Sequence, residues 1–160
     1  MKIISVVGFH NTGKTTTVEN LITYLKNNGF TVSSIKDIHR EGFTMEKEGS
    51  NSQRHLKASN TYVFARGEKE TYLIWDRKLT FSEMLSYINT DWLIIEGMNE
   101  ENFPRIIAAR NESDVDSFIK NKVIAVTGAL SESISEYKSI PVINAIQNIE
   151  MLGKLVETLV

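Results

Sequence analysis

A glycine-rich stretch near the N-terminus has the residue types and the spacing needed to hold a phosphate chain. Gly8, Gly13, Lys14 and Thr15 complete the pattern G-x-x-x-x-G-K-[ST] within "VVGFHNTGKTTT". In this pattern the glycines let backbone N–H groups converge on phosphate oxygens, and the lysine reaches the β- and γ-phosphates. The threonine hydroxyl is a ligand of Mg²⁺. The stretch therefore predicts a phosphate-binding loop for a nucleoside triphosphate.

The remaining predicted contacts to the nucleotide come from the loop itself and from the sheet edge beside it. Asn11 and Thr12 lie inside the loop, and Thr16 is placed to contact the α-phosphate. Contacts to the base are expected at the carboxyl edge of the sheet, where the candidates are Thr127, Gly128 and Asn144. The usual guanine signature N-K-x-D is absent from the sequence, so the residues alone leave the base open.

A phosphate cradle also needs a carboxylate that holds Mg²⁺ or its water shell, at the end of a neighbouring strand. Glu96 in "LIIEG" and Asp37, which ends the second predicted strand, are the candidates. With Thr15 they form the predicted metal site, and Lys14 and Glu96 are the predicted catalytic residues. The alternative for Glu96 is a surface residue in a tight turn before Gly97, and the alternative for Asp37 is a strand-end cap.

The phosphate-binding loop must lie between a strand and a helix, and the flanking sequence has both patterns. "IISVV" (3–7) is an unbroken apolar run, typical of a strand buried on both faces, and residues 18–25 have helical apolar spacing. Further strands are predicted over 30–36, 91–97, 105–109, 123–128 and 140–144, and a final helix from about residue 148. This alternation predicts an α/β fold of the P-loop NTPase type, with three layers, a mostly parallel sheet and helices on both faces.

A second pattern interrupts this plan. "TYVFAR" and "TYLIW" flank "GEKE" and predict an inserted β-hairpin over 61–75, preceded by a polar loop over 37–52 and followed by a capping box from Thr80 to Glu83. An isolated two-stranded ribbon cannot bury so much apolar surface, and the unpaired backbone groups of its edge strands can pair with another chain. We therefore expect a homodimer formed through 61–75, the alternative being a monomer whose hairpin folds onto its own sheet.

The composition of the chain limits the remaining classes of protein to which it can belong. The 160 residues, 41% of them hydrophobic, suit one compact domain over 1–160, and a net charge of −2 gives no global case for nucleic acid or an anionic membrane. The absence of cysteine excludes disulfides and thiolate metal sites. The apolar start "MKIISVVG" is shorter than the apolar core of a signal peptide or a membrane span, which predicts a cytoplasmic protein.

The histidines lack the spacing of a metal site, because His10, His39 and His55 are far apart in the sequence. His10 falls at a variable position of the loop and is expected to be a surface residue. Arg54 and His55 follow a glycine-rich segment, where they are candidates for contact with an anionic group. The alternative for both is a solvated helix face.

Several stretches together resemble the molybdopterin-guanine dinucleotide biosynthesis protein B (MobB) family of P-loop GTP-binding proteins. They are "GFHNTGKTTTVENLITYLKNNGFTVSSIK", "GSNSQRHLKAS", "LIIEG" followed by "FPRI", and "VIAVTG…IPVINAIQNIEML". The resemblance implies GTP with Mg²⁺, weak intrinsic hydrolysis and dimerisation. It also implies association with the nucleotidyltransferase that attaches GMP to molybdopterin, with molybdopterin as a further candidate ligand. The chain departs from the family where "KDIHRE" keeps only His39 of a histidine-rich stretch, and where Gly128 replaces an expected acidic residue.

The resulting expectation is a GTP-binding accessory protein of molybdenum cofactor biosynthesis with weak Mg²⁺-dependent GTPase activity. Slow hydrolysis is expected because the sequence offers no evident arginine finger or water-orienting glutamine. A small-molecule kinase that uses the same loop is one alternative, although it needs an acceptor pocket and an arginine-bearing lid. A regulatory switch that binds the nucleotide and partners without turnover is the other.

Overall fold

The computed structural model of the chain describes residues 1–59, 61–99, 102–120 and 122–160. The chain divides into two compact units, which we name the sheet unit (Met1–Ile38 with Asn89–Val160) and the hairpin unit (His39–Ile88). That residues 1–160 behave as a single domain stays a prediction. Among the described residues, no helix is both long enough and apolar enough to cross a membrane.

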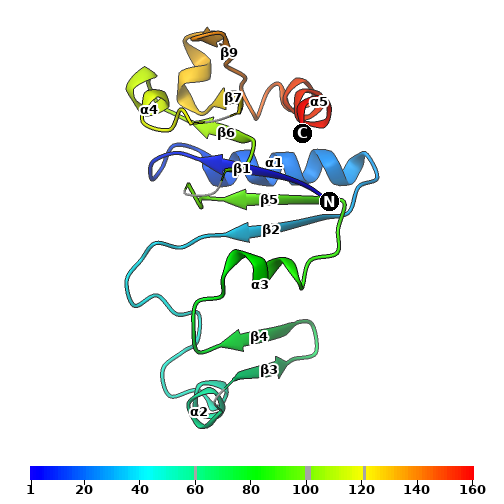
Figure 1. Cartoon of the computed structure of the whole chain (residues 1–160), viewed down its shortest axis with the longest axis vertical. Coiled ribbons are helices and arrows are strands. Elements are labelled where there is room, and N and C mark those ends of the chain that lie inside the picture. The colour runs from blue at the N-terminus through cyan, green and yellow to red at the C-terminus, as the bar shows by residue number, and fades with distance from the viewer. Residues whose placement is uncertain (60, 100–101, 121) are drawn as a thin grey trace. The chain divides into compact units, whose positions relative to one another are not determined.

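Five parallel strands form the centre of the sheet unit, in the order β2-β5-β1-β6-β7 (Figure 1). Their bounds are β1 (Lys2–Val7), β2 (Val32–Lys36), β5 (Trp92–Glu96), β6 (Arg105–Ala108) and β7 (Val123–Thr127). The central strands are mostly apolar and are buried on both faces, as their hydrophobic runs predicted, and Ser5 and Arg105 are their buried polar members. Their carboxyl ends meet at one edge of the sheet.

Two long helices cover one face of this sheet. α1 (Lys14–Asn27) and α5 (Ile149–Leu159) pack against it through a buried cluster that includes Leu21, Leu25, Leu152 and Val156. The helices also contact each other, because the Tyr24 hydroxyl donates to the Glu157 carboxylate over 2.7 Å. A Cβ added at Gly153 would lie 2.2 Å from the Tyr24 ring, so this contact requires glycine in α5. The predicted helices at both positions are confirmed.

The opposite face carries a second buried cluster. α4 (Glu112–Asp116) and the short 3-10 helix η1 (Ala129–Glu132) contribute Val115 and Leu130 to it. These side chains pack against Val7, Ile107 and Val126 of the strands, which alternate with the residues that face α1 and α5. Helices therefore lie on both faces of the sheet, and the predicted three-layer α/β fold is confirmed.

The segment 140–144, predicted as a further buried strand, is not a strand of this sheet. β9 (Ile140–Pro141) pairs with β8 (Glu136–Tyr137) in a short antiparallel ribbon, and Val142 joins β7 through an isolated bridge to Val126. Proline has no backbone N–H to donate to a ladder, which is one reason why the apolar run does not extend the sheet. The sheet accordingly has β7 as its edge strand.

The hairpin unit contains the predicted ribbon as a separate two-stranded sheet. β3 (Tyr62–Arg66) and β4 (Thr71–Trp75) are antiparallel, preceded by α2 (Asn51–Ala58) and followed by α3 (Phe81–Leu85). The expected capping box is present, because the Thr80 hydroxyl accepts from the Glu83 N–H and the Glu83 carboxylate accepts from the Thr80 N–H. Residues 37–50 form no helix or strand, so the predicted loop ends slightly earlier than expected.

Aromatic side chains gather on one face of this hairpin, and we name Tyr62, Phe64, Trp75 and Tyr87 the aromatic face. The register places Tyr62 opposite Trp75, with ring centroids 5.4 Å apart. Phe64 lies 5.8 Å from the Tyr62 ring, and Tyr87 lies 5.3 Å from Trp75. Tyr62, Phe64 and Tyr87 are nevertheless 47%, 63% and 62% exposed. Such a cluster leaves much apolar surface in water.

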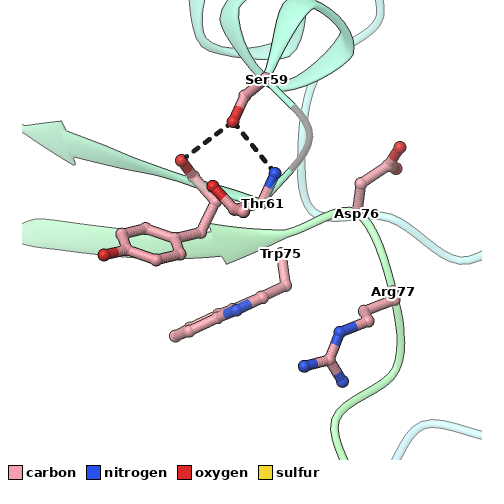
Figure 2. Close-up of a pocket in the computed structure, with 6 residues that line it drawn as sticks. Ser59, Thr61, Trp75, Asp76 and Arg77 are labelled. Atoms are coloured by element: carbon pink, nitrogen blue, oxygen red, sulfur yellow. Dashed lines mark hydrogen bonds between the residues drawn. The ribbon is translucent and has the colours of Figure 1, made fainter.

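Ser59, at the end of α2, is hydrogen-bonded to the start of the hairpin. Its hydroxyl accepts from the Thr61 N–H and donates to the Tyr62 carbonyl, each over 3.3 Å (Figure 2). A shallow pocket of about 380 Å³ lies here, next to the aromatic face, and Trp75 and Arg77 belong to its wall. Arg77 is held by the Glu83 carboxylate over 2.7 and 3.0 Å.

Candidate functional site

The phosphate loop, residues 8–15, connects the carboxyl end of β1 to the start of α1 in the sheet unit. Its two motif glycines are required by the backbone. A Cβ at Gly8 would lie 2.2 Å from the Ala108 carbonyl oxygen of the neighbouring strand, so the loop and β6 approach too closely for any side chain. Gly13 caps α1 with a φ of 97°, in the left-handed region that glycine adopts without strain.

The backbone N–H groups at the start of α1 are open to a ligand. Within the described parts of the chain, the first of them to find a backbone acceptor is that of Thr17, which donates to the Gly13 carbonyl over 3.0 Å. For the preceding N–H groups, at residues 13–16, no acceptor is found among the described residues, as is usual at the positive end of a helix. This arrangement suits an anion with several acceptor oxygens, such as a phosphate chain.

Two side chains hold the loop in shape around this opening. The Thr12 hydroxyl donates to the Phe9 carbonyl over 2.9 Å, and the Lys14 ammonium donates to the same carbonyl over 2.5 Å. Burial lowers the pKa of Lys14, whereas the nearby Glu96 carboxylate acts in the opposite direction. The Lys14 side chain thus lies across the loop, with its nitrogen at the Phe9 carbonyl. Asn11 and Thr16 are exposed beside it, and Asn11 has a φ of 58°.

The predicted acidic residue lies at the phosphate loop. Glu96 ends β5 directly beside β1, where it is the register partner of Val6. Its carboxylate accepts a 2.9 Å hydrogen bond from the Thr15 hydroxyl, and its side chain is only 12% exposed. A hydroxyl and a carboxylate oxygen at this distance are hard donors of the kind that Mg²⁺ takes in proteins. The residues present therefore fit the metal of a bound nucleotide.

Lys36 is the member of this group that sequence reasoning missed. Its ammonium lies 3.0 Å from both carboxylate oxygens of Glu96 and 3.2 Å from the Thr15 hydroxyl. The position follows from the sheet, since β2 and β5 are parallel neighbours and Lys36 is the register partner of Glu96. The only signal in the sequence was its place at the end of a predicted strand.

Asp37 follows Lys36, and its backbone N–H donates to the Glu96 carbonyl over 2.9 Å. The chain at Asp37 thus runs beside the predicted acid, but a ligand role for Asp37 stays a prediction. The described residues hold no group of three or more histidine, cysteine, aspartate or glutamate side chains suited to a metal. A metal at the loop would draw its other ligands from phosphate and water, as Mg²⁺ commonly does.

Gly128, which stands where an acidic residue was expected, is explained by the packing of the loop. A Cβ at this position would lie 2.5 Å from the Ala109 carbonyl oxygen and 2.6 Å from the Thr12 carbonyl oxygen. The backbone after β7 therefore presses directly on the phosphate loop, at a φ of 90°. No side chain fits there without a shift of the loop.

The two remaining candidates for base contacts have different surroundings. Thr127 ends β7 and is 1% exposed, so its side chain is buried beneath the surface that a ligand would contact. The Asn144 side-chain oxygen accepts from the N–H groups of Ile146 and Gln147, over 2.9 and 3.0 Å. In the predicted contact with a base, these bonds leave the Asn144 amide N–H₂ group as the donor. Both assignments stay predictions.

The other singled-out residues lie elsewhere in the chain. Arg54 and His55 belong to the hairpin unit, where they are exposed on α2 and line a pocket of about 470 Å³. His39 begins the hairpin unit, and His10 is exposed in the phosphate loop. His10 is thus a surface residue, as expected, and any contact of His39, Arg54 or His55 with a ligand stays a prediction.

A parallel sheet with a glycine-rich phosphate loop at its carboxyl edge, followed at once by a helix, defines a P-loop α/β protein. The comparison with protein families is more specific. The model of the MobB family, described as molybdopterin guanine dinucleotide synthesis protein B, matches residues 3–129. The chain belongs to the MobB family, and the resemblance noted in the sequence is confirmed.

Individual relatives agree with this membership. A probable molybdopterin-guanine dinucleotide biosynthesis adapter protein of Bacillus subtilis is 26% identical over 149 residues, which are 89% of this chain and 85% of that protein. The adapter protein of the same name in Haemophilus influenzae is 28% identical over 117 residues, which are 69% of this chain and 64% of that protein.

Solved structures show the same fold. The crystal structure of Bacillus subtilis MobB matches with a TM-score of 0.80 at 23% identity, covering 99% of this chain and 97% of that chain. The MobB homologue of Bacillus stearothermophilus matches with a TM-score of 0.72 at 21% identity, covering 99% of both chains. These identities are low, so the likeness establishes the fold alone.

Proposed function

We propose that this chain is a GTP-binding adapter protein with weak Mg²⁺-dependent GTPase activity, acting in the biosynthesis of molybdopterin guanine dinucleotide in the cytoplasm. The observation that supports it most directly is the 2.9 Å hydrogen bond from Thr15 to Glu96, at a loop whose N–H groups are open. The pathway comes from the family and from the names of the relatives.

In this proposal each residue has a separate task. The loop N–H groups and Lys14 bind the phosphate oxygens, and Thr15 and Glu96 hold the metal. When bound, Mg²⁺ neutralises charge on the phosphates. Within the part of the chain that the structure describes, Thr15 and Lys36 are the side chains that hydrogen-bond the Glu96 carboxylate. Slow hydrolysis is expected because the sequence offers no evident arginine finger or water-orienting glutamine.

The preference for GTP rests on the family, and Asn144 gives it a testable form. Because the Asn144 side-chain oxygen already accepts two hydrogen bonds, its N–H₂ group is the part proposed to donate to acceptors on a purine edge. Guanine offers O6 and N7 as acceptors, whereas adenine carries a donor in place of O6. An Asn144→Ala variant should therefore lose more affinity for GTP than for ATP.

The adapter role requires partners. The nucleotidyltransferase that attaches GMP to molybdopterin is the proposed partner, molybdopterin is a further candidate ligand, and a second copy of the chain is proposed to pair through residues 61–75. The aromatic face supports the second copy, because Tyr62 and Phe64 of the two-stranded ribbon, and Tyr87 packed against it, are about half exposed or more. Such a ribbon needs further cover to be stable.

Calorimetry with GTP and Mg²⁺ tests the nucleotide site. Lys14→Ala removes a charge-assisted phosphate contact and Thr15→Ala removes a metal ligand, so each should weaken binding by about 2 kcal/mol or more. Lys26→Ala, at an exposed position in the last turn of α1, is the matched control. Unchanged affinity in both loop variants would remove the loop as the nucleotide site.

Turnover measurements separate the proposal from its alternatives. Slow release of inorganic phosphate from GTP, without transfer to an added small-molecule acceptor, supports the GTPase. Phosphate transfer to an acceptor hydroxyl would instead establish a kinase, and tight binding without turnover would establish a regulatory switch. Co-purification with the nucleotidyltransferase, compared with and without GTP, tests the adapter role directly.

A further inference from the structure

Lys36 holds the position between the two proposed metal ligands. Its ammonium is equally close, at 3.0 Å, to both oxygens of the Glu96 carboxylate, and it also reaches the Thr15 hydroxyl at 3.2 Å. These are the same oxygen atoms that the proposed function assigns to Mg²⁺. A cation of the chain and a cation from solution therefore compete for one place.

We propose that Lys36 is a resident cation that Mg²⁺ displaces when it arrives with the nucleotide, and that Lys36 thereby sets how strongly nucleotide binding depends on the metal. This inference rests on the proposed function. Without metal, Lys36 neutralises Glu96, so the negative phosphate chain enters a site that holds no uncompensated carboxylate. With metal, the ammonium leaves and Mg²⁺ takes over the carboxylate and the hydroxyl.

The difference in burial between the two side chains means that Lys36 moves away on displacement while Glu96 stays in place. The Lys36 side chain is 55% exposed, whereas the Glu96 side chain is 12% exposed. An ion pair with a largely exposed partner contributes little to stability, and a lysine stem is flexible, so Lys36 swings into solvent at low cost. Glu96 is fixed by β5 and stays. The ammonium is thus a replaceable occupant, while the oxygen donors form a permanent frame.

A second positive charge at the loop reinforces this reading. Lys14 belongs to the phosphate loop, where its ammonium donates to the Phe9 carbonyl over 2.5 Å. The loop therefore holds two ammonium groups and one carboxylate. Removing Lys36 leaves one of each, which disfavours a metal-free phosphate chain.

The test compares GTP affinity in EDTA and in excess Mg²⁺ by calorimetry. For each variant, metal dependence is measured as the dissociation constant in EDTA divided by the dissociation constant in Mg²⁺. Lys36→Met should raise this ratio by about tenfold or more, chiefly through weaker binding in EDTA. Lys36→Arg, which keeps the charge, should stay near wild type, and Lys26→Met is the control for loss of an exposed lysine. Equal ratios, within about twofold, in wild type and Lys36→Met would overturn the inference.

A second measurement needs no nucleotide and separates the two proposals. In nucleotide-free protein, millimolar Mg²⁺ should raise the unfolding temperature of Lys36→Met by a few degrees more than that of wild type, because Glu96 then lacks its cation. If no variant binds GTP, the proposed function fails, and this titration alone decides on Lys36. Equal response to Mg²⁺ in wild type and Lys36→Met would overturn the inference there.

Discussion

The Thr15 hydroxyl donates a hydrogen bond of 2.9 Å to the Glu96 carboxylate, although the two residues are 81 positions apart in the sequence. Thr15 belongs to the first turn of α1 and Glu96 to the last position of β5. The contact arises because β5 lies directly beside β1, whose carboxyl end leads into the phosphate loop. Sheet order thus brings a candidate metal ligand to the loop.

Replacement of Glu96 by glutamine should separate metal-assisted from metal-free binding. The amide retains the shape of the side chain but removes the negative charge that holds Mg²⁺. We expect GTP affinity in Mg²⁺ to fall by about tenfold or more, with a smaller change in EDTA. Calorimetry in the two buffers measures both values. An equal loss in both would assign Glu96 to the structure of the turn before Gly97.

Alanine at position 128 should disturb the phosphate loop from the side of β7. Its Cβ would overlap the carbonyl oxygens of Ala109 and Thr12, and the backbone there has a left-handed φ. We expect Gly128→Ala to lower the free energy of unfolding by about 3 kcal/mol and to weaken GTP binding. Denaturant unfolding and calorimetry measure the two effects.

Gly29→Ala is the matched control for that experiment. Gly29 also has a positive φ, of 86°, but an added Cβ would meet no atom within 4 Å. Only the backbone strain is then common to the two variants, so the control should cost about 1 kcal/mol and leave GTP affinity unchanged. Similar losses in both variants would mean that contact with the loop does not matter.

Charges placed on the hairpin should break the proposed dimer. The register puts Phe64 on the aromatic face and Tyr72 on the other, since Tyr72 is opposite Ala65. Phe64→Glu and Tyr72→Glu therefore sample both faces, and at least one should shift the mass in light scattering from about twice that of the 18.1 kDa chain to that of one chain. Lys69→Glu, in the exposed turn, is the control. A wild-type mass near 18.1 kDa, unchanged by GTP and Mg²⁺, would exclude the dimer.

Alkaline pH should weaken the contact between α1 and α5. Burial, together with the hydrogen bond to Glu157, raises the pKa of Tyr24 to about 12. An unfolded tyrosine ionises at about pH 10. The stabilisation by the Tyr24 hydroxyl is therefore fully present below that pH and is lost as the pH rises toward 12. The difference in unfolding free energy between wild type and Tyr24→Phe should therefore shrink over this range.

Urea unfolding at a series of pH values measures that difference. Tyr87→Phe, which removes the hydroxyl of an exposed tyrosine of the hairpin unit, serves as the control. A difference for Tyr24→Phe that stays constant between about pH 10 and about 12 would contradict the assigned role of its hydroxyl.

Much of the fold could be predicted because its signals are local. The phosphate loop is defined by neighbouring residues, and the capping box at Thr80 needs only a partner three positions later. Glu96 could be predicted as well, since parallel strands present their carboxyl ends at one edge. The run over 140–144 misled because apolar β-branched residues mark burial, which a short ribbon next to the sheet also provides.

Lys36 could not be predicted, for a different physical reason. Its role depends on β2 being the immediate neighbour of β5, and the order of strands is set by long-range pairing. A lysine stem also has four flexible bonds, so its position along the chain does not fix where its charge lies. The need for glycine at position 128 is likewise a contact between distant segments of backbone.

The strand order also determines when each strand can pair during synthesis of the chain. β1 is made before any other described strand, yet its neighbours in the sheet are β5 and β6, over residues 92–108. The apolar β1 therefore leaves the ribosome with neither partner made, while the hairpin of β3 and β4 closes locally and early. Nascent chains that stall inside the hairpin unit keep β1 unpaired, and these are the fragments that should aggregate or recruit chaperones.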